Sequence, residues 1–362
     1  MFTSALRTCV ATTSFSSNIF TTSRWLHTSQ DQTIVNSTSY PITDKPIGLI
    51  GCPIDLGAGK RGVDMGPFSL RHAQITPRLR SELGLEVNDH GNIYVPQSGD
   101  IEVVDEAARF WPVIEKVLAD LSAATERIYA SGEFPVTLGG DHVLAAGSLS
   151  GVQRARRKAG ELDLGFLWLD AHTDMNCPLT TPSGNMHGMS AAALLGIDVK
   201  GASSVVGEDG WFDPARTAWV GIRDVDREEA RNLEQKGLVV GRNIFTMTEI
   251  DSLGIGEVMR RALNACAAGG SQFALSVDVD AVDPSEAPGV GTPVPGGLTF
   301  REAHYAMELC AEHGGLTAMD LVEVNPLLDN HNQTAETAIG LLLSALGKRT
   351  IMLPNAPRVS KN

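Results

Sequence analysis

The feature that most constrains the fold is an alternation of short apolar runs with amphipathic segments. Apolar runs typical of strands occupy residues 47–54, 134–138, 164–169, 218–222, 238–240, 273–279 and 316–324. Segments with helical periodicity occupy residues 110–129, 143–158, 227–235, 257–267, 300–313 and 334–346. Strands that are apolar throughout and alternate with helices indicate a parallel sheet covered on both faces. We therefore expect one α/β domain that begins near residue 46.

Polar residues follow five of the predicted strands directly. They are Asp141 and His142, the acids and histidine of residues 170–174, the acids of residues 223–226, the acids of residues 278–280, and Glu323. A single Asp after a strand is an ordinary turn former. In an open parallel sheet, however, ligands bind beyond the carboxyl ends of the strands. Five such endings therefore predict a functional site at this edge of the sheet.

Six of these side chains form a candidate metal cluster: His142, Asp170, His172, Asp174, Asp278 and Asp280. The i, i+2, i+4 spacing of residues 170, 172 and 174 places their side chains on one face of an extended segment. Four carboxylates this close cannot all ionise without compensating cations. The set exceeds what one zinc ion needs and, being rich in oxygen, favours Mn²⁺. Two ions about 3.5–4 Å apart would satisfy every ligand and predict metal-assisted hydrolysis.

Composition excludes other classes of function. The chain has 29 Lys and Arg against 43 Asp and Glu, a net charge of −14, so we expect no nucleic-acid partner. It has no apolar window of about 18 residues, so we expect no membrane span. The cysteines lie far apart in the sequence, which predicts neither a disulfide framework nor a zinc knuckle and fits a reducing compartment; they are Cys9, Cys52, Cys177, Cys266 and Cys310.

The N-terminal segment differs from the rest of the chain. Residues 1–30 contain no Asp or Glu, carry Arg7 and Arg24, and are rich in Ser and Thr. This composition is typical of a mitochondrial transit peptide, and the alternative is a disordered tail without a targeting role. We therefore expect a mitochondrial protein, or otherwise a cytoplasmic one. The expected organisation is a transit peptide at 1–30, a polar lead-in at 31–45, the catalytic domain at 46–352 and a tail at 353–362.

Three motifs, at residues 139–142, 170–174 and 276–284, resemble the metal signatures of the ureohydrolases, the family of arginases and agmatinases. The resemblance extends from Gly48 to about Arg349. It implies a three-layer α/β/α sandwich with a mostly parallel central sheet, two Mn²⁺ ions, and a homotrimer or homohexamer. It also implies two ligand sets that share Asp170 and Asp278. His142 and Asp174 complete the first set, and His172 and Asp280 complete the second.

The loop at residues 176–188 resembles the arginase version of this family. The resemblance implies that neutral donors hold the α-carboxylate of an amino acid; these are Asn176, Thr181, Ser183 and Asn185. Asp226 matches the residue that contacts the α-amino group. Residues 188–190 read Gly-Met-Ser, whereas many arginases have a proline there.

Three further positions match the family. His187 matches the proton shuttle, and an imidazole is suited to moving protons near pH 7. Glu323 matches the carboxylate that pairs with the guanidinium group. Thr292 matches a residue on the substrate side of the pocket.

The resemblance implies hydrolysis of L-arginine to L-ornithine and urea by attack of a metal-bridging hydroxide on the guanidinium carbon. Asp174 would accept the hydroxide proton and help to pass it to the leaving amine, and His187 would exchange protons with solvent. Two alternatives remain open at this point. One is a hydrolase of another guanidino compound, either agmatine or a guanidino acid, and the other is a silent family member with a regulatory role.

Overall fold

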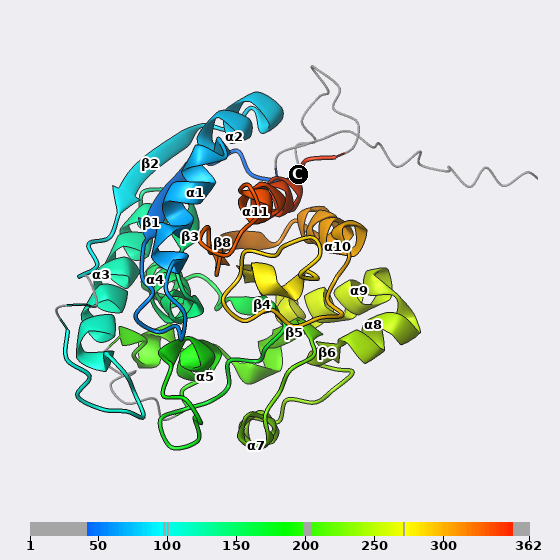
Figure 1. Cartoon of the computed structure of the whole chain (residues 1–362). Helices are drawn as coiled ribbons and strands as arrows, with labels where there is room; N and C mark the ends of the chain where they lie inside the picture. Colours follow the sequence, from blue (N-terminus) through cyan, green and yellow to red (C-terminus); the bar gives the residue numbers. More distant parts are fainter. Residues whose placement is uncertain (1–41, 97–98, 100, 198–204, 271, 350–362) are drawn as a thin grey trace, which may run out of the picture. The chain divides into compact units, whose positions relative to one another are not determined.

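The computed structural model describes residues 42–96, 99, 101–197, 205–270 and 272–349. The predicted transit peptide, most of the predicted lead-in and the predicted tail lie outside these residues. Within them, one sheet of eight parallel strands has the order β2-β1-β3-β8-β7-β4-β5-β6 (Figure 1). The strands are β1 (Ile47–Cys52), β2 (Val87–Asn92), β3 (Phe134–Gly139), β4 (Gly165–Leu169), β5 (Thr217–Ile222), β6 (Ile244–Thr246), β7 (Phe273–Asp278) and β8 (Leu316–Val322).

Helices cover both faces of the sheet (Figure 1). One layer comprises α1 (Gly66–His72), α2 (Ile75–Leu83), α8 (Met247–Leu253), α9 (Ile255–Cys266), α10 (Phe300–His313) and α11 (Gln333–Ala345). The other comprises α3 (Trp111–Ala130), α4 (Ala145–Lys158), α5 (Ser190–Leu194) and α7 (Arg227–Gln235). The expected three-layer α/β/α sandwich is thereby confirmed. No helix among the described residues has the length and apolar content needed to cross a bilayer.

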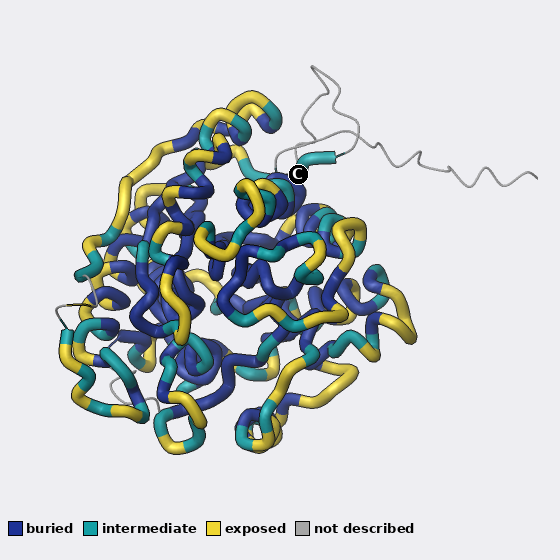
Figure 2. Tube along the Cα trace, in the orientation of Figure 1, coloured by how far each residue is buried: buried dark blue, intermediate teal, exposed yellow. Residues whose placement is uncertain are grey.

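Successive side chains of the central strands point alternately to the two faces of the sheet and pack into the apolar layer on each face. In β4, Leu167 and Leu169 pack with the first layer, whereas Phe166 and Trp168 pack with the second. All four side chains are fully buried, and the strands lie inside the buried core in Figure 2. Burial of apolar surface on both faces stabilises the sheet by about 25 cal/mol per Å². This explains why the central strands are apolar throughout instead of alternating with polar residues.

One predicted strand is wrong. The run at 238–240 forms no strand; only Val240 makes an isolated β-bridge, to Ile244, and the flanking Gly237 and Gly241 have φ angles of 70° and 81°, in the left-handed region. Val240 is 58% exposed, and the strand itself is the short β6 that follows. Left-handed glycines on both sides break the extended backbone that a strand requires. Apolar character alone therefore misplaced this strand by a few residues.

Other elements carry too weak a pattern to be predicted. Strand β2 is polar, and five of its six residues are exposed, because it is an edge strand. Arg71 of α1 fixes it by donating two hydrogen bonds of 2.8 Å to Asp89. Helices α1, α2 and α8 are short, at seven, nine and seven residues.

The register of four neighbouring strands aligns their carboxyl ends. Leu138 of β3 pairs with Leu321 of β8, which pairs with Val277 of β7, which pairs with Leu169 of β4. The residues that follow this row therefore emerge side by side at one edge of the sheet. Loops that are distant in sequence consequently meet there.

Gly165 tests the packing at the other end of β4. A Cβ atom there would lie 2.1 Å from the carbonyl oxygen of Cys266 and 2.3 Å from that of Arg216. We expect Gly165→Ala to lower the free energy of unfolding by about 3 kcal/mol, measured by urea denaturation. Gly188→Ala is the control, because no atom lies within 4 Å of its added Cβ. Equal stabilities of the two variants would contradict this packing.

Candidate metal centre

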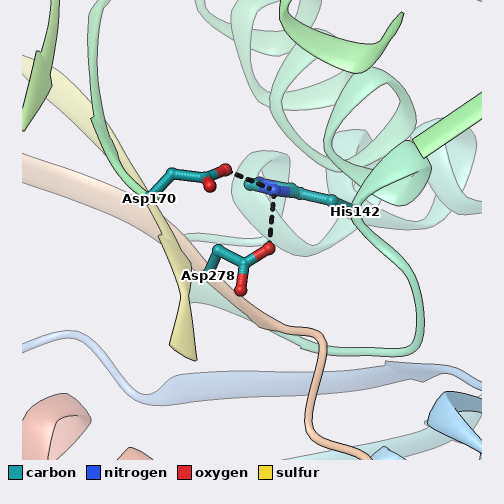
Figure 3. A group of neighbouring side chains, drawn as sticks. All are labelled: His142, Asp170 and Asp278. Carbon is teal, nitrogen blue, oxygen red and sulfur yellow. Dashed lines mark ion pairs between the residues drawn. The ribbon is translucent and has the colours of Figure 1, made fainter. Parts of the chain in front are cut away.

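The six predicted ligands meet at the carboxyl edge of the sheet. His142 begins η3 (His142–Leu144), the short helix after β3. Asp170, His172 and Asp174 lie in the loop after β4, where Asp174 has a left-handed φ of 52°. Asp278 ends β7, and Asp280 lies in η8 (Val279–Ala281). Figure 3 shows His142 pointing toward Asp170 and Asp278 from the opposite side of the cluster.

The cluster contains two adjacent groups of ligand atoms that share Asp170. His142 Nδ1 lies 3.0 Å from Asp170 Oδ2, 3.1 Å from Asp174 Oδ2 and 3.2 Å from Asp278 Oδ2. His172 Nδ1 lies 3.3 Å from Asp170 Oδ1 and 3.1 Å from Asp280 Oδ2. The ligand atoms of His142, Asp170 and Asp278 lie within 4.8 Å of one another, as do those of Asp170, His172 and Asp280, which is the size of a metal site. Asp170 presents one oxygen to each group and is positioned to bridge two ions.

Hydrogen bonds to His142 show that a cation fits the first group. His142 Nε2 lies 2.8 Å from Ser276 Oγ, and that hydroxyl donates to Asp320 Oδ1 at 2.5 Å. Ser276 therefore accepts a hydrogen bond from Nε2–H, so the neutral form of the ring carries its lone pair on Nδ1. Nδ1 is buried, has no hydrogen bond of its own, and faces three carboxylate oxygens. A lone pair facing anionic oxygens is repulsive unless a cation lies between them.

The charges of the cluster also favour bound cations. Burial raises the pKa values of Asp174, Asp278 and Asp280, and the neighbouring carboxylates raise them further. Burial also acts to raise the pKa of Asp170, but its contacts with His142 and His172 outweigh burial and lower it. Four buried carboxylates compete for two imidazoles, and divalent cations would relieve this repulsion.

Three residues that sequence reasoning missed support the ligands. Trp168 stacks on the His142 ring at 4.1 Å, and its Nε1 donates to Asp170 Oδ2 at 2.8 Å. Ser276 and Asp320 hold Nε2 of the same ring. A signal was available, because Trp168 and Ser276 each lie two residues before a ligand and therefore on the same face of their strands.

Glu323 and His187 lie beside the metal ligands. Glu323 Oε1 accepts a 2.9 Å hydrogen bond from the His142 backbone N–H and lies 3.2 Å from His187 Nδ1. Glu323 Oε2 is buried and has no hydrogen-bond partner among the described residues. Burial lowers the pKa of His187, but the nearby Glu323 outweighs it and raises the pKa to about 9. The pair therefore offers one free carboxylate oxygen and one proton donor.

The predicted substrate residues lie in one loop and at the start of α7. Asn176 Nδ2 donates to Asp226 Oδ2 at 2.8 Å, so these two side chains are in contact. Thr181, Ser183 and Asn185 form an adjoining turn, in which the Ser183 hydroxyl accepts the Asn185 N–H at 3.2 Å. Ser183 is exposed and Asn185 half-buried, so both are accessible to a ligand.

The remaining predicted residue, Thr292, contacts the second ligand group. Its hydroxyl donates to Asp280 Oδ2 at 3.2 Å. All fourteen predicted site residues thus lie in the metal cluster, beside it, in the loop that continues from it, or, for Asp226, at the start of α7 in contact with that loop.

Comparisons with known proteins agree on one family. The model of the arginase family matches residues 45–347. The arginase of Bacillus caldovelox is 40% identical over 306 residues, which cover 84% of this chain and 99% of that protein. Its crystal structure superposes with a TM-score of 0.79 over 85% of this chain. The arginase of Bacillus subtilis is 40% identical over 314 residues, or 85% of this chain and all of that one. A structure of Entamoeba histolytica arginase with L-ornithine is 29% identical, with a TM-score of 0.75 over 84% of this chain and 99% of that one.

Metal loading should stabilise the fold strongly. We expect the chain to bind two Mn²⁺ ions and to gain about 3 kcal/mol of stability at a hundredfold excess over the dissociation constant. EDTA should reverse the gain in a thermal melt. Asp278→Ala should bind less than one ion per chain and show no such gain. Equal metal content in Asp278→Ala and the wild type, measured by elemental analysis, would contradict the site.

The His187–Glu323 pair predicts a pH dependence of stability in the metal-free protein. The folded pKa of His187, about 9, exceeds the usual value of 6.5. The stabilisation, up to about 3 kcal/mol, is therefore complete below pH 6.5 and is lost as the pH rises through 9. In urea unfolding, the difference between wild type and His187→Asn should shrink across this range. A difference that does not change with pH would show that the pair is not ionic.

Proposed function

Because the chain belongs to the arginase family, we propose that it hydrolyses L-arginine to L-ornithine and urea with two Mn²⁺ ions. The observation that carries this proposal is the position of Glu323, whose free carboxylate oxygen is buried beside two ligand groups that share Asp170. A buried carboxylate oxygen without a hydrogen-bond partner needs a donor, and a planar guanidinium group provides a charged one.

The donor set supports manganese. Four carboxylates and two imidazoles match the preference of Mn²⁺ for oxygen and nitrogen ligands. His142, Asp170, Asp174 and Asp278 would hold one ion, and Asp170, His172, Asp278 and Asp280 the other. A pair of such ions makes hydroxide available from water near neutral pH.

The substrate would extend from Glu323 toward the loop at residues 176–185. Glu323 would bind the guanidinium group, and Asp226 would bind the α-amino group. The neutral donors of the loop would hold the α-carboxylate; they are Asn176, Thr181, Ser183 and Asn185. Thr292, which contacts Asp280, would line the pocket beside the reacting carbon.

Proton transfer would be divided between two side chains. Asp174 Oδ2 accepts a 3.2 Å hydrogen bond from Ser190, which orients the carboxylate to accept the proton released by the attacking water. In the metal-free protein His187 has a pKa of about 9 and is therefore protonated near pH 7. Asp174 would pass the proton that it accepts to the leaving amine, and His187, whose side chain is 18% exposed, would exchange protons between solvent and the site.

The assembly and destination of the protein are part of the same proposal. We propose a homotrimer or homohexamer, to be measured by light scattering coupled to gel filtration. We also propose mitochondrial import directed by residues 1–30, because this segment is basic and free of acids. A reporter fused to residues 1–35 should enter mitochondria, and a diffuse cytosolic signal would refute import.

Substrate choice separates the proposed reaction from its alternatives. The Mn²⁺-loaded protein should release urea from L-arginine, and much less from agmatine or 4-guanidinobutyrate, which lack the α-amino acid group. His172→Ala should release none. Urea from another guanidine instead would preserve the metal chemistry and replace the substrate. Two bound ions with no urea from any compound would favour a silent regulator.

The carboxylate-binding loop should affect substrate binding more than metal binding. Ser183→Ala and Asn185→Ala each remove one donor to a charged group, so we expect KM for L-arginine to rise about tenfold or more. Bound Mn²⁺ should remain at two ions per chain by elemental analysis. If either variant lost metal and substrate binding together, the loop would belong to the metal site instead.

A further inference from the structure

Helix α7 presents buried polar side chains to the segment that leads from the metal ligands into the loop at residues 176–185. It begins after Asp226, whose carboxylate accepts hydrogen bonds from the N–H groups of Glu228 and Glu229 at 2.8 and 2.9 Å. Glu229 and Asn232 are three residues apart and share one side of the helix. Their exposed fractions are only 7% and 4%. Buried polar groups need partners, and Glu229 and Asn232 find theirs mainly at Thr173 and at the Met175 backbone, just before the loop.

The two side chains hold both polar groups of a single backbone residue, Met175. The Met175 N–H donates to Glu229 Oε1 at 3.2 Å. The Met175 carbonyl accepts a 2.7 Å hydrogen bond from Asn232 Nδ2. Met175 lies between Asp174, a proposed metal ligand, and Asn176, the first proposed substrate residue. It is the junction between the two parts of the site.

The backbone at this junction needs such support. Asp174 has a φ of 52°, a left-handed conformation that is unfavourable for residues other than glycine. The direction in which the loop leaves the metal cluster therefore depends on contacts beyond Asp174. Among those contacts, the hydrogen bond from Asn232 is the shortest one to the Met175 backbone.

Asn232 also contacts the far side of the same turn. Its Nδ2 lies 3.5 Å from Thr180 Oγ1, and that hydroxyl donates to Asn176 Oδ1 at 2.9 Å. The other end of the Asn176 side chain donates to Asp226 at the start of α7. Both ends of the Asn176 amide are thus fixed by groups that Asn232 or its helix holds in place.

We propose that Asn232 is a positioning residue that sets the distance between the metal centre and the carboxylate-binding loop, and thereby selects guanidino amino acids by chain length. This inference rests on the proposed function. Asn232 itself touches neither the ligands nor, in the proposed arrangement, the substrate. It acts through the Met175 backbone, so its loss should change where the α-carboxylate is held and leave the chemical step in place.

Asn232→Asp tests this with little change of shape, because it replaces the donor by an oxygen facing the Met175 carbonyl. We expect KM for L-arginine to rise about tenfold, kcat to change less than about twofold, and two Mn²⁺ to remain bound. The preference for L-arginine over analogues with one methylene more or fewer, as a ratio of kcat/KM, should fall about fivefold or more. Asn232→Ala is the second variant, in case the aspartate prevents folding.

Arg231→Ala is the matched control, since Arg231 is exposed on the same helix and pairs with Glu228. It should match the wild type throughout. Hydrogen exchange in the metal-free proteins gives a readout without turnover. The peptide containing residues 175–185 should exchange faster in Asn232→Asp than in the wild type and the control.

Three results would overturn the inference: unchanged KM and length preference, unchanged exchange, or loss of metal together with kcat. Failure of the wild type to release urea from L-arginine would instead refute the proposed function, and the exchange experiment would still decide whether Asn232 positions the loop.

Discussion

The structure depends on a balance of charge at one edge of the sheet. Four carboxylates and two imidazoles are gathered there, and most of them are buried. Burial raises the pKa values of three of the carboxylates, so this arrangement is unfavourable unless cations occupy it. Asp170 is central, because its two oxygens face different histidines. The fold can keep such a cluster because eight parallel strands, covered by helices on both faces, supply a rigid frame.

Around this cluster, each neighbouring group is held by residues outside it. Ser276, held by Asp320, accepts a hydrogen bond from Nε2 of His142. Trp168 stacks on the His142 ring and donates a hydrogen bond to Asp170. Glu323, with a left-handed φ of 63°, links the His142 backbone to His187. On the other side, α7 holds the loop that leaves Asp174. The residues proposed to bind the metal ions, the guanidinium group and the α-carboxylate are therefore different residues, but hydrogen bonds and packing contacts link them to one another.

Sequence reasoning predicted the fold class and family correctly, because apolar strands and acidic strand ends are strong signals. It placed the ligands together because carboxyl ends of parallel strands share an edge. It missed β2, whose stability comes from its neighbour β1 and from Arg71 instead of apolar residues. It also missed Asn232, since a polar residue in a polar helix gives no sign of burial until the loop is placed against it. The roles of the substrate residues remain predictions, as does import into mitochondria.

The central claim is that Asp170 bridges two metal ions. Anomalous diffraction at the manganese edge from crystals of the Mn²⁺-loaded protein tests it directly. The account predicts two peaks about 3.5–4 Å apart, one on each side of the Asp170 carboxylate, with His142 and His172 bound to different ions. A single peak, or two peaks that do not share Asp170, would contradict the account.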